Sequence, residues 1–542
     1  MARTPLLHTL RQFMRAARTR RVAAPPPQYA AKYSVTRRDF LAGLGALSAA
    51  AAFPGVTHAA QRKPHIAIVG GGIAGLSCAL ALADRGIRAT VYEASRRIGG
   101  RMYSNTAYWN DGQVSEWGGE LIDSGHETIQ GLAQRFGLTL DNLLDAQPTA
   151  SEDTYYFFGH YYPKAQADLD FAVLLDAVLA DLEAAGYPTT FDAYTSAGQL
   201  LDQMSIYEWI ESRVPGGHSS ALGQLLDVAY AIEYGADTTE QSALNLIYLL
   251  GYQPEPTGLA VFGESDEAFH IRGGNEQLPR AIAQYLGEER IELGRRLVRI
   301  KQTRRGGYQL RFKTLGGDTE NLHADYVVLA LPFSVLREVD LTDAGFDALK
   351  LQAIEQLGRG RSAKTQLQFN ARLWNESGAW PGVSTGSTYS DTGYQSSWEV
   401  TRTQQGDSGI MNFFAGGSVS AQMSSSRAFA TAANPQALAD AQTTLQSAEQ
   451  VYPGLTALWN GKLTQSLPHL SPLMRASYAY YRVGQYTAFG GYEGVRQGGV
   501  LFCGDHTSQD FQGFMEGAAS EGQRAGEELA TLLAAPRLSA DR

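Results

Sequence analysis

The sequence predicts an α/β fold in which a parallel-sheet domain is joined to a second, α+β domain. Three observations predict it. The 542 residues are too many for one ordinary domain. Near the beginning, a short β-branched run leads through a glycine-rich turn into an apolar helix and a second strand. A mainly helical block and then a series of strand patterns follow, which predicts a discontinuous second domain with a mixed sheet and a helical insertion.

The glycine-rich turn has the spacing of a dinucleotide site. A β-branched strand over 65–69 precedes Gly70, Gly72 and Gly75, which fill the G-x-G-x-x-G positions, and a second strand ends at Glu93. The glycines permit the tight turn, the approach of a pyrophosphate and close helix packing, while the acid can bind a ribose hydroxyl. This context predicts a Rossmann-like dinucleotide-binding domain. The alternative, a purely structural turn, requires the acid and the strand–helix context to be coincidental.

The first 60 residues have the composition of an export signal. They contain eight Arg, one Lys and a single acid, Asp39. The pair Arg37-Arg38 precedes an alanine-rich apolar run over 41–53, and Thr57-His-Ala59 is a small-residue cleavage pattern. The apolar run is shorter than the ~20 residues that span a bilayer. We therefore expect a twin-arginine signal, cleavage near Ala59 or Ala60, a periplasmic or secreted location and no membrane span.

Charge and cysteine content exclude some function classes. Removing a segment of net charge +8 from a chain of net charge −10 would leave about −18. Such an acidic chain disfavours nucleic acid and favours cationic ligands, although plain solubility explains the acidity equally well. Cys78 and Cys503, the two cysteines of the sequence, lie in apolar patterns and are expected to be buried small side chains. The sequence has no CxxC or HExxH motif, so we expect no metal site.

Two further loops follow the second strand. Arg96-Arg-Ile-Gly-Gly-Arg101 suits a loop against phosphates, because arginine supplies bidentate donors; a solvated basic loop is the alternative. In Glu116-Trp-Gly-Gly-Glu-Leu-Ile-Asp123, the glycine pair predicts a close backbone approach to a flat group, and Glu120 and Asp123 are candidate polar contacts.

These three stretches together resemble the flavin-containing amine oxidase family, which includes monoamine oxidases, polyamine oxidases and L-amino-acid oxidases. The resemblance covers about residues 63–533 and is densest at both ends of that range. It implies FAD as the cofactor and an FAD-binding domain of the GR2 type. Gln485 stands where monoamine oxidases attach the flavin through a cysteine, so the resemblance implies that FAD is held non-covalently.

The resemblance also implies a division of the chain into segments. These are a signal peptide (1–60), three parts of the FAD-binding domain (61–124, 270–345 and 490–535), a helical part of the substrate domain (125–269) and the remainder of that domain (346–489). The helical part is rich in acids, which suits a cationic substrate, although a solvated helical face explains them as well; they are Asp227, Glu233, Asp237, Glu264, Asp266 and Glu267.

Carried over residue by residue, the family pattern assigns candidate roles. Lys364, near the start of a strand over 362–369, would hold a water against flavin N5; Tyr486 and Phe514 would form two aromatic walls of the substrate slot. Trp398, Glu120 and Asp123 are further candidate substrate contacts. The candidate cofactor contacts are Gly70, Gly72, Ala74, Gly75, Glu93, Ala94, Arg97, Gly100, Arg101, Gly118, Gly119, Glu120, Leu121, Val298, Gly504, Asp505, Phe514 and Met515.

The implied reaction is oxidation of an amine or L-amino acid by hydride transfer to the flavin, with oxygen as acceptor and peroxide as product. Gly119-Glu-Leu-Ile122 lacks the arginine with which classical L-amino-acid oxidases bind the carboxylate, so an amine, or an amino acid bound from elsewhere, is expected. A cationic substrate such as a polyamine, arginine or lysine is favoured. The alternatives are a dehydrogenase or desaturase that reduces a quinone, and a non-catalytic flavin-binding protein. The resemblance leaves a homodimer open.

Overall fold

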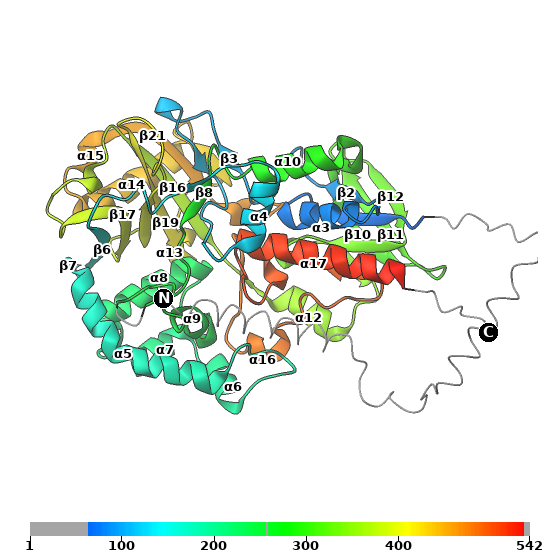
Figure 1. Cartoon of the computed structure of the whole chain (residues 1–542), viewed down its shortest axis with the longest axis horizontal. Helices are drawn as coiled ribbons and strands as arrows, with labels where there is room; N and C mark the ends of the chain where they lie inside the picture. The colour runs from blue at the N-terminus through cyan, green and yellow to red at the C-terminus, as the bar shows by residue number, and fades with distance from the viewer. Residues whose placement is uncertain (1–62, 256–257, 536–542) are drawn as a thin grey trace, which may run out of the picture. The chain divides into compact units, whose positions relative to one another are not determined.

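The computed structural model describes residues 63–255 and 258–535 (Figure 1). The predicted export signal over 1–60 lies outside the described residues. Across the described ranges, every helix is too short or too polar to cross a bilayer.

A five-stranded parallel sheet forms the centre of the first domain. Its order is β23-β13-β1-β2-β9, so its neighbours come from both ends and the middle of the chain. The β-branched run predicted as a strand is β1, whose four residues are all buried. The strands are β1 (Ile66–Val69), β2 (Thr90–Glu93), β9 (Ile291–Leu293), β13 (Tyr326–Leu329) and β23 (Val500–Phe502).

Two helices that are far apart in the sequence cover one face of this sheet. Helix α3 (Ile73–Ala83) and helix α17 (Met515–Ala534) run side by side in Figure 1. Small residues permit their contact: a Cβ at Gly522 would lie 2.1 Å from the carbonyl oxygen of Ala74. The prediction that Cys78 and Cys503 are buried is confirmed, because both are free and wholly inaccessible. Helices α4 (Glu127–Arg135) and α10 (Gln277–Leu286) pack nearby.

A four-stranded sheet, ordered β12-β11-β10-β14, packs on the opposite face through a shared apolar cluster. The segment 291–302 forms two strands, because Gly294, with a φ of +72°, separates them. The elements are β10 (Arg295–Gln302), β11 (Tyr308–Thr314), β12 (Thr319–Ala324) and β14 (Asp340–Asp343).

The second domain is built on an eight-stranded mixed sheet, ordered β20-β21-β16-β19-β18-β17-β6-β7. The predicted strand over 362–369 is β16, at full length. Helix α14 (Pro435–Val451) packs an apolar face into the core of this domain. The strands are β6 (Ser151–Phe157), β7 (His160–Tyr162), β16 (Ser362–Phe369), β17 (Val383–Ser390), β18 (Ser396–Glu399), β19 (Gly409–Gly416), β20 (Phe429–Thr431) and β21 (Trp459–Ser466).

The segment 125–269 is helical only in part. Its strands β6 and β7 complete the mixed sheet, where β6 pairs in parallel with β17. Their tyrosine-rich sequence shows no clear alternation, which is why the helical expectation did not reveal them. The helices are α5 (Lys164–Ala185), α6 (Ser196–Asp202), α7 (Ile206–Arg213), α8 (Ala221–Tyr234) and α9 (Ala243–Leu250).

Short elements connect these layers and carry several site residues. The strands among them are β3 (Ser104–Asn105), β4 (Ser115–Glu116), β5 (Leu140–Asn142), β8 (Phe269–Ile271), β15 (Gly358–Arg359) and β22 (Ala479–Tyr480). The helices are α11 (Phe333–Leu336), α12 (Ala348–Gln356), α13 (Gly417–Ala421), α15 (Leu455–Leu458) and α16 (Gln485–Phe489).

Candidate active site

The turn between β1 and α3 has the shape predicted from its glycines. Gly70 has a φ of +112°, and a Cβ at Gly75 would lie 2.0 Å from the carbonyl oxygen of Gly70. Ala74 lies in the first turn of α3, and Gly72 lies against the backbone of Gly100. The turn therefore leaves the N-terminus of α3 free of side chains, as an approaching pyrophosphate requires.

Glu93 ends β2 beside that turn. Its carboxylate accepts hydrogen bonds from the backbone N–H of Gly71 and of Ser95, each at 2.8 Å, so the acid and the turn are held together. Ala94 follows it in the same loop. Val298, which by the family resemblance would lie along the adenine, is half-buried at a bulge of β10. The ribose and adenine contacts remain predictions.

The arginines of the next loop bind protein groups. Arg97 donates to the carbonyl oxygens of Ile98 and Gly100, and its guanidinium lies over the ring of Tyr103. Arg101 forms a bidentate ion pair with Asp505, which places two predicted cofactor residues together. Although burial opposes ionisation, Arg101 holds the pKa of Asp505 well below its usual range.

A cavity adjoins this pair. Its lining includes Arg101, Tyr478, Asp505 and His506. His506 follows the Gly504 turn and is buried, yet neither ring nitrogen has a hydrogen-bond partner within the described residues. A buried imidazole without a hydrogen-bond partner, in a concave site, fits a polar cofactor group such as a ribityl chain or phosphate.

The glycine pair of the 116–123 loop faces protein and not an open surface. A Cβ at Gly118 would lie 1.8 Å from the carbonyl oxygen of Arg101, and one at Gly119 would lie 2.8 Å from Sδ of Met515. The close approach predicted for this pair is therefore made by the protein's own chain. Leu121 is half-buried beside it.

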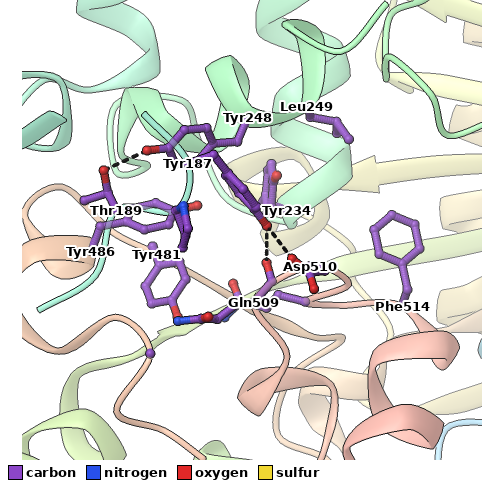
Figure 2. Close-up of a pocket in the computed structure, with 13 residues that line it drawn as sticks. Tyr187, Thr189, Tyr234, Tyr248, Leu249, Tyr481, Tyr486, Gln509, Asp510 and Phe514 are labelled. Carbon is purple, nitrogen blue, oxygen red and sulfur yellow. Dashed lines mark hydrogen bonds between the residues drawn. The ribbon is translucent and has the colours of Figure 1, made fainter. Parts of the chain in front are cut away.

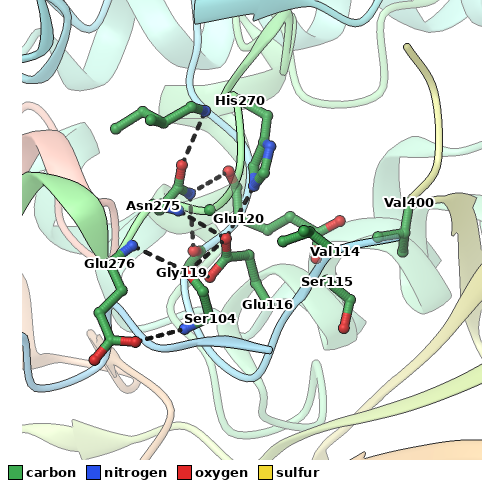
Figure 3. Close-up of polar contacts among 12 residues, drawn as sticks. Ser104, Val114, Ser115, Glu116, Gly119, Glu120, His270, Asn275, Glu276 and Val400 are labelled. Carbon is green, nitrogen blue, oxygen red and sulfur yellow. Dashed lines mark hydrogen bonds and ion pairs between the residues drawn. The ribbon is translucent and has the colours of Figure 1, made fainter. Parts of the chain in front are cut away.

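A polar network that sequence reasoning missed fixes this loop (Figure 3). The buried carboxylate of Glu116 accepts from the hydroxyl of Ser104 and the backbone N–H of Asn275, and it contacts Nε2 of His270 at 2.9 Å. The side-chain amide of Asn275 in turn donates to the carbonyl oxygens of Gly119 and Glu120. The network sets the backbone from which the Glu120 carboxylate projects.

Glu120 meets the two candidate residues of the mixed sheet. Its carboxylate accepts from Nζ of Lys364 at 2.5 Å and from Nε1 of Trp398 at 2.9 Å. Burial favours the neutral acid, but these partners outweigh it and the pKa of Glu120 lies below its ordinary value. Lys364 neutralises this carboxylate, so Glu120 offers a substrate less negative charge than the sequence predicts.

The two predicted aromatic walls line one cavity (Figure 2). The ring of Tyr486 packs on Tyr481 and Tyr248, and its hydroxyl donates to Oδ1 of Asn245 at 3.0 Å. Phe514 lies across the cavity at the N-cap of α17 and packs edge-on against His126. The cavity is mainly apolar, which disfavours a charged amine within it.

Asp123 lies apart from the Lys364 pair. Its carboxylate accepts from the backbone N–H of Glu267 at 3.0 Å, and it faces His126 at 3.3 Å. Burial raises its pKa to about 6. Asp123 therefore joins a separate set of acidic groups that includes Glu267 and Glu233.

Comparison with known proteins shows to which family the chain belongs. A sequence profile described as "Flavin containing amine oxidoreductase" matches residues 73–530. The chain belongs to the flavin-containing amine oxidoreductase family. Its cofactor is FAD.

Relatives within the family are similar over part of their length. An L-amino-acid oxidase of Siganus canaliculatus is 26% identical over 340 residues, which are 58% of each chain. One of Bothrops pauloensis is 24% identical over 341 residues, or 60% of this chain and 63% of that one. The match thus spans about three fifths of the length of these relatives.

Solved structures of similar fold match more of the chain. Cyclohexylamine oxidase from Brevibacterium oxydans IH-35A has a TM-score of 0.73 at 21% identity, covering 87% of this chain and 99% of that one. Putrescine oxidase bound to putrescine has a TM-score of 0.71 at 18% identity, covering 86% and 99%. These likenesses establish that this chain shares their fold.

Proposed function

We propose that the protein is an FAD-dependent oxidase of an amine or L-amino acid. The observation that carries the proposal is the convergence of Lys364 and Trp398, from two strands of the mixed sheet, on Glu120 of the FAD-domain loop. A buried ammonium at the junction of the two domains is suited to stabilise negative charge on a reduced ring and to orient oxygen or water.

Several residues would hold FAD. The turn at Gly70–Gly75 and the N-terminus of α3 suit the pyrophosphate, Glu93 the adenosine ribose, and Asp505 and His506 the ribityl end. The amide of Met515, at the N-terminus of α17, would favour negative charge on the ring. When bound, FAD would accept a hydride equivalent from the amine-bearing carbon and pass the electrons to oxygen, which yields an imine and hydrogen peroxide; water then converts the imine to a carbonyl and ammonia.

The protein groups supply binding and desolvation. Tyr486 and Phe514 bound a mainly apolar cavity, which favours a deprotonated amine as the reacting form. Lys364 provides positive charge near the reacting end, where Glu120 pairs with it.

The attachment of FAD is proposed to be non-covalent. Gln485 is buried, and its side-chain amide donates to the carbonyl oxygen of Gln356 and accepts from the backbone N–H of Arg482. We predict that acid precipitation of the purified holoprotein leaves all of the flavin in the supernatant. Flavin retained in the pellet would contradict non-covalent binding.

A cationic substrate is proposed over a neutral one. Glu233 and Glu267 are acids of the helical segment, and both reach the interior near Asp123. A bound cation would favour the ionised form of these two acids, and the attraction between the opposite charges would be strong because the surrounding dielectric is low.

Peroxide formation in air tests the proposal. The purified holoenzyme is assayed with cadaverine, putrescine, L-lysine, L-arginine, L-norleucine and hexylamine, with flavin bleaching under anaerobic conditions as the second readout. We expect bleaching and stoichiometric peroxide with the cationic compounds. Activity on hexylamine and L-norleucine alone would reject the cationic preference.

The alternative enzyme class is a dehydrogenase or desaturase that reduces a quinone. The same experiment separates it, since bleaching without peroxide in air, and turnover on adding a quinone, would favour it. Flavin that no amine bleaches would support a non-catalytic flavoprotein.

A further inference from the structure

Four charged residues form a cluster that is separate from the Lys364–Glu120 pair but interacts electrostatically with Glu120. Asp123 follows the glycine loop, Glu233 lies near the end of α8, Glu267 precedes β8 and Arg402 follows β18. We call them the Arg402 cluster. They come from both domains, and the carboxylates of Glu267 and of Glu120 interact electrostatically with the Arg402 guanidinium.

Arg402 has unused hydrogen-bonding capacity. The residue is 7% exposed, and its Nε donates to the carbonyl oxygen of Glu399 at 3.1 Å. Its terminal Nη1 and Nη2 make no hydrogen bond or ion pair with any residue in 63–255 or 258–535. Its largest electrostatic attraction is to Glu267, which nevertheless lies beyond ion-pair distance. A buried guanidinium fork of this kind is complementary to a carboxylate.

Glu267 is held in place at a conformational cost. Its φ is +49°, in the left-handed region that residues other than glycine enter at a conformational cost. The backbone N–H of Glu267 is fixed by Asp123, while its carboxylate makes no hydrogen bond to the described part of the chain. The backbone of Glu267 is therefore fixed, while its carboxylate stays available to bind a ligand.

Arg402 does not balance the acids of the cluster. Burial raises the pKa of Glu267 to about 8 and that of Glu233 to about 7, and repulsion from Asp123 adds to both shifts. Arg402 only partly offsets the shift of Glu267. A bound ligand cation would lower these pKa values and complete the charge balance that the protein side chains leave open.

We propose that the Arg402 cluster is a subsite for a diamino acid or guanidino amino acid. Arg402 binds the substrate carboxylate through Nη1 and Nη2, and Glu267 with Glu233 binds a side-chain ammonium or guanidinium. The proposal rests on the oxidase function proposed above and narrows its substrate to compounds that carry both groups, such as L-lysine, L-ornithine and L-arginine.

Binding of the substrate carboxylate by Arg402 is tested by comparing two substrates of the holoenzyme. L-lysine and cadaverine differ by one carboxylate. We expect kcat/KM to be at least roughly ten-fold higher for L-lysine, and Arg402→Gln to lower it on the order of 10²-fold for L-lysine while leaving cadaverine unchanged. Arg402→Lys keeps the positive charge but lacks the two Nη donors, so its kcat/KM for L-lysine should lie between those of the native enzyme and Arg402→Gln. The exposed Arg304→Gln is the matched control and should change neither substrate.

Cation binding by the Arg402 cluster is tested with a different pair of substrates. L-lysine and L-norleucine differ in the side-chain ammonium. Glu267→Gln should lower kcat/KM for L-lysine by roughly ten-fold or more and leave L-norleucine unchanged. Melting temperature and bound flavin of each variant verify that the fold is intact.

Binding without turnover gives an independent readout. 4-Guanidinobutanoate carries a carboxylate and a guanidinium but no primary amine, and its binding to the holoenzyme is measured by calorimetry at pH 7 in two buffers. We expect binding with release of protons, because the cation ionises Glu267 and Glu233, and these face Asp123, Glu120 and Arg402. Butanoate and propylguanidine, which each carry one group, should bind at least roughly ten-fold more weakly.

Two outcomes would overturn the subsite. One is an equal loss of activity on L-lysine and cadaverine in Arg402→Gln, which would make Arg402 a structural counter-ion. The other is binding of 4-guanidinobutanoate that is unaffected by Arg402→Gln. If no amine bleaches the flavin but 4-guanidinobutanoate binds through Arg402, the oxidase proposal fails and the subsite stands.

Discussion

At the residue scale, the contact between Lys364 and Glu120 joins stability to chemistry. Both side chains are largely buried, at 12% and 5% exposure. Removing one partner of such a pair leaves an uncompensated buried charge, whereas removing both does not. The pair can therefore be tested apart from catalysis.

We predict that Lys364→Met lowers the free energy of unfolding by about 3–5 kcal/mol. Adding Glu120→Gln should recover much of that loss, because the glutamine is neutral and can still accept the hydrogen bond from Trp398. Denaturant titration of both variants measures the difference. Peroxide formation should stay low in both, since neither has the ammonium; a double variant with full oxidase activity would contradict the role of Lys364.

A second prediction concerns the effect of Glu267 on the pH dependence of stability. Its pKa is raised from an ordinary 4.5 to about 8. The unfolded chain therefore releases this proton at lower pH than the folded protein, so stability falls as pH rises from about 4.5 to 8. Glu233, Asp123, Glu120 and Arg402 face the group and set the size of the effect.

In Glu267→Gln, the decline in melting temperature between pH 5 and pH 9 should be smaller than in the native protein by a few degrees. Thermal unfolding across this range measures it. Identical pH profiles for the two proteins would show that Glu267 ionises at its ordinary pKa.

At the scale of elements, the α3–α17 contact couples the C-terminal helix to the glycine turn. A Cβ at Gly522 would lie 2.1 Å from a backbone oxygen of α3, whereas nothing lies within 4 Å of a Cβ at Gly131 in α4. The two helical glycines thus form a matched pair.

We predict that Gly522→Ala destabilises the protein by about 1–3 kcal/mol and weakens FAD binding, because the helices must separate at the turn. Gly131→Ala should be neutral or stabilising by roughly 0.5–1 kcal/mol, since alanine favours a helix. Flavin fluorescence titration and thermal unfolding measure both effects. Equal behaviour of the two variants would mean that the α3–α17 contact is not tight.

The elements that periodicity predicts best are those whose local pattern decides their structure. Strand β16 and the turn at Gly70 follow directly from alternation and glycine spacing. Strands β6 and β7 were missed because their pattern depends on pairing with β17, more than 220 residues later.

The residues of the candidate site likewise divide into those that local sequence predicts and those that only the folded chain brings together. The Rossmann-like turn and Glu93 are local in sequence, so spacing placed them together. Glu116 and Asn275 are 159 positions apart, and their bond forms only in the folded chain. Arg402 lies in a loop without a motif, and the role proposed for it rests on its burial, which no local pattern reveals.

At the scale of the whole molecule, we propose that the twin arginines direct export of the folded, flavin-loaded protein. Replacing Arg37 and Arg38 by lysine should leave the protein in the cytoplasm, because this export route reads the arginine pair. Cell fractionation with peroxide assays of each fraction measures the distribution. Unchanged export of the double variant would contradict the signal.

The central sheet has a consequence for synthesis on the ribosome. Its adjacent strands β1, β13 and β23 begin at residues 66, 326 and 500, so the last of the three is translated long after the first. At the usual 5–20 residues per second, the interval is roughly 20–90 s. During that time the nascent chain exposes the apolar face of α3, which α17 later covers, and the backbone edge of β13, with which β23 later pairs. We therefore expect nascent chains to benefit from chaperone protection and to enclose FAD only once translation is nearly complete.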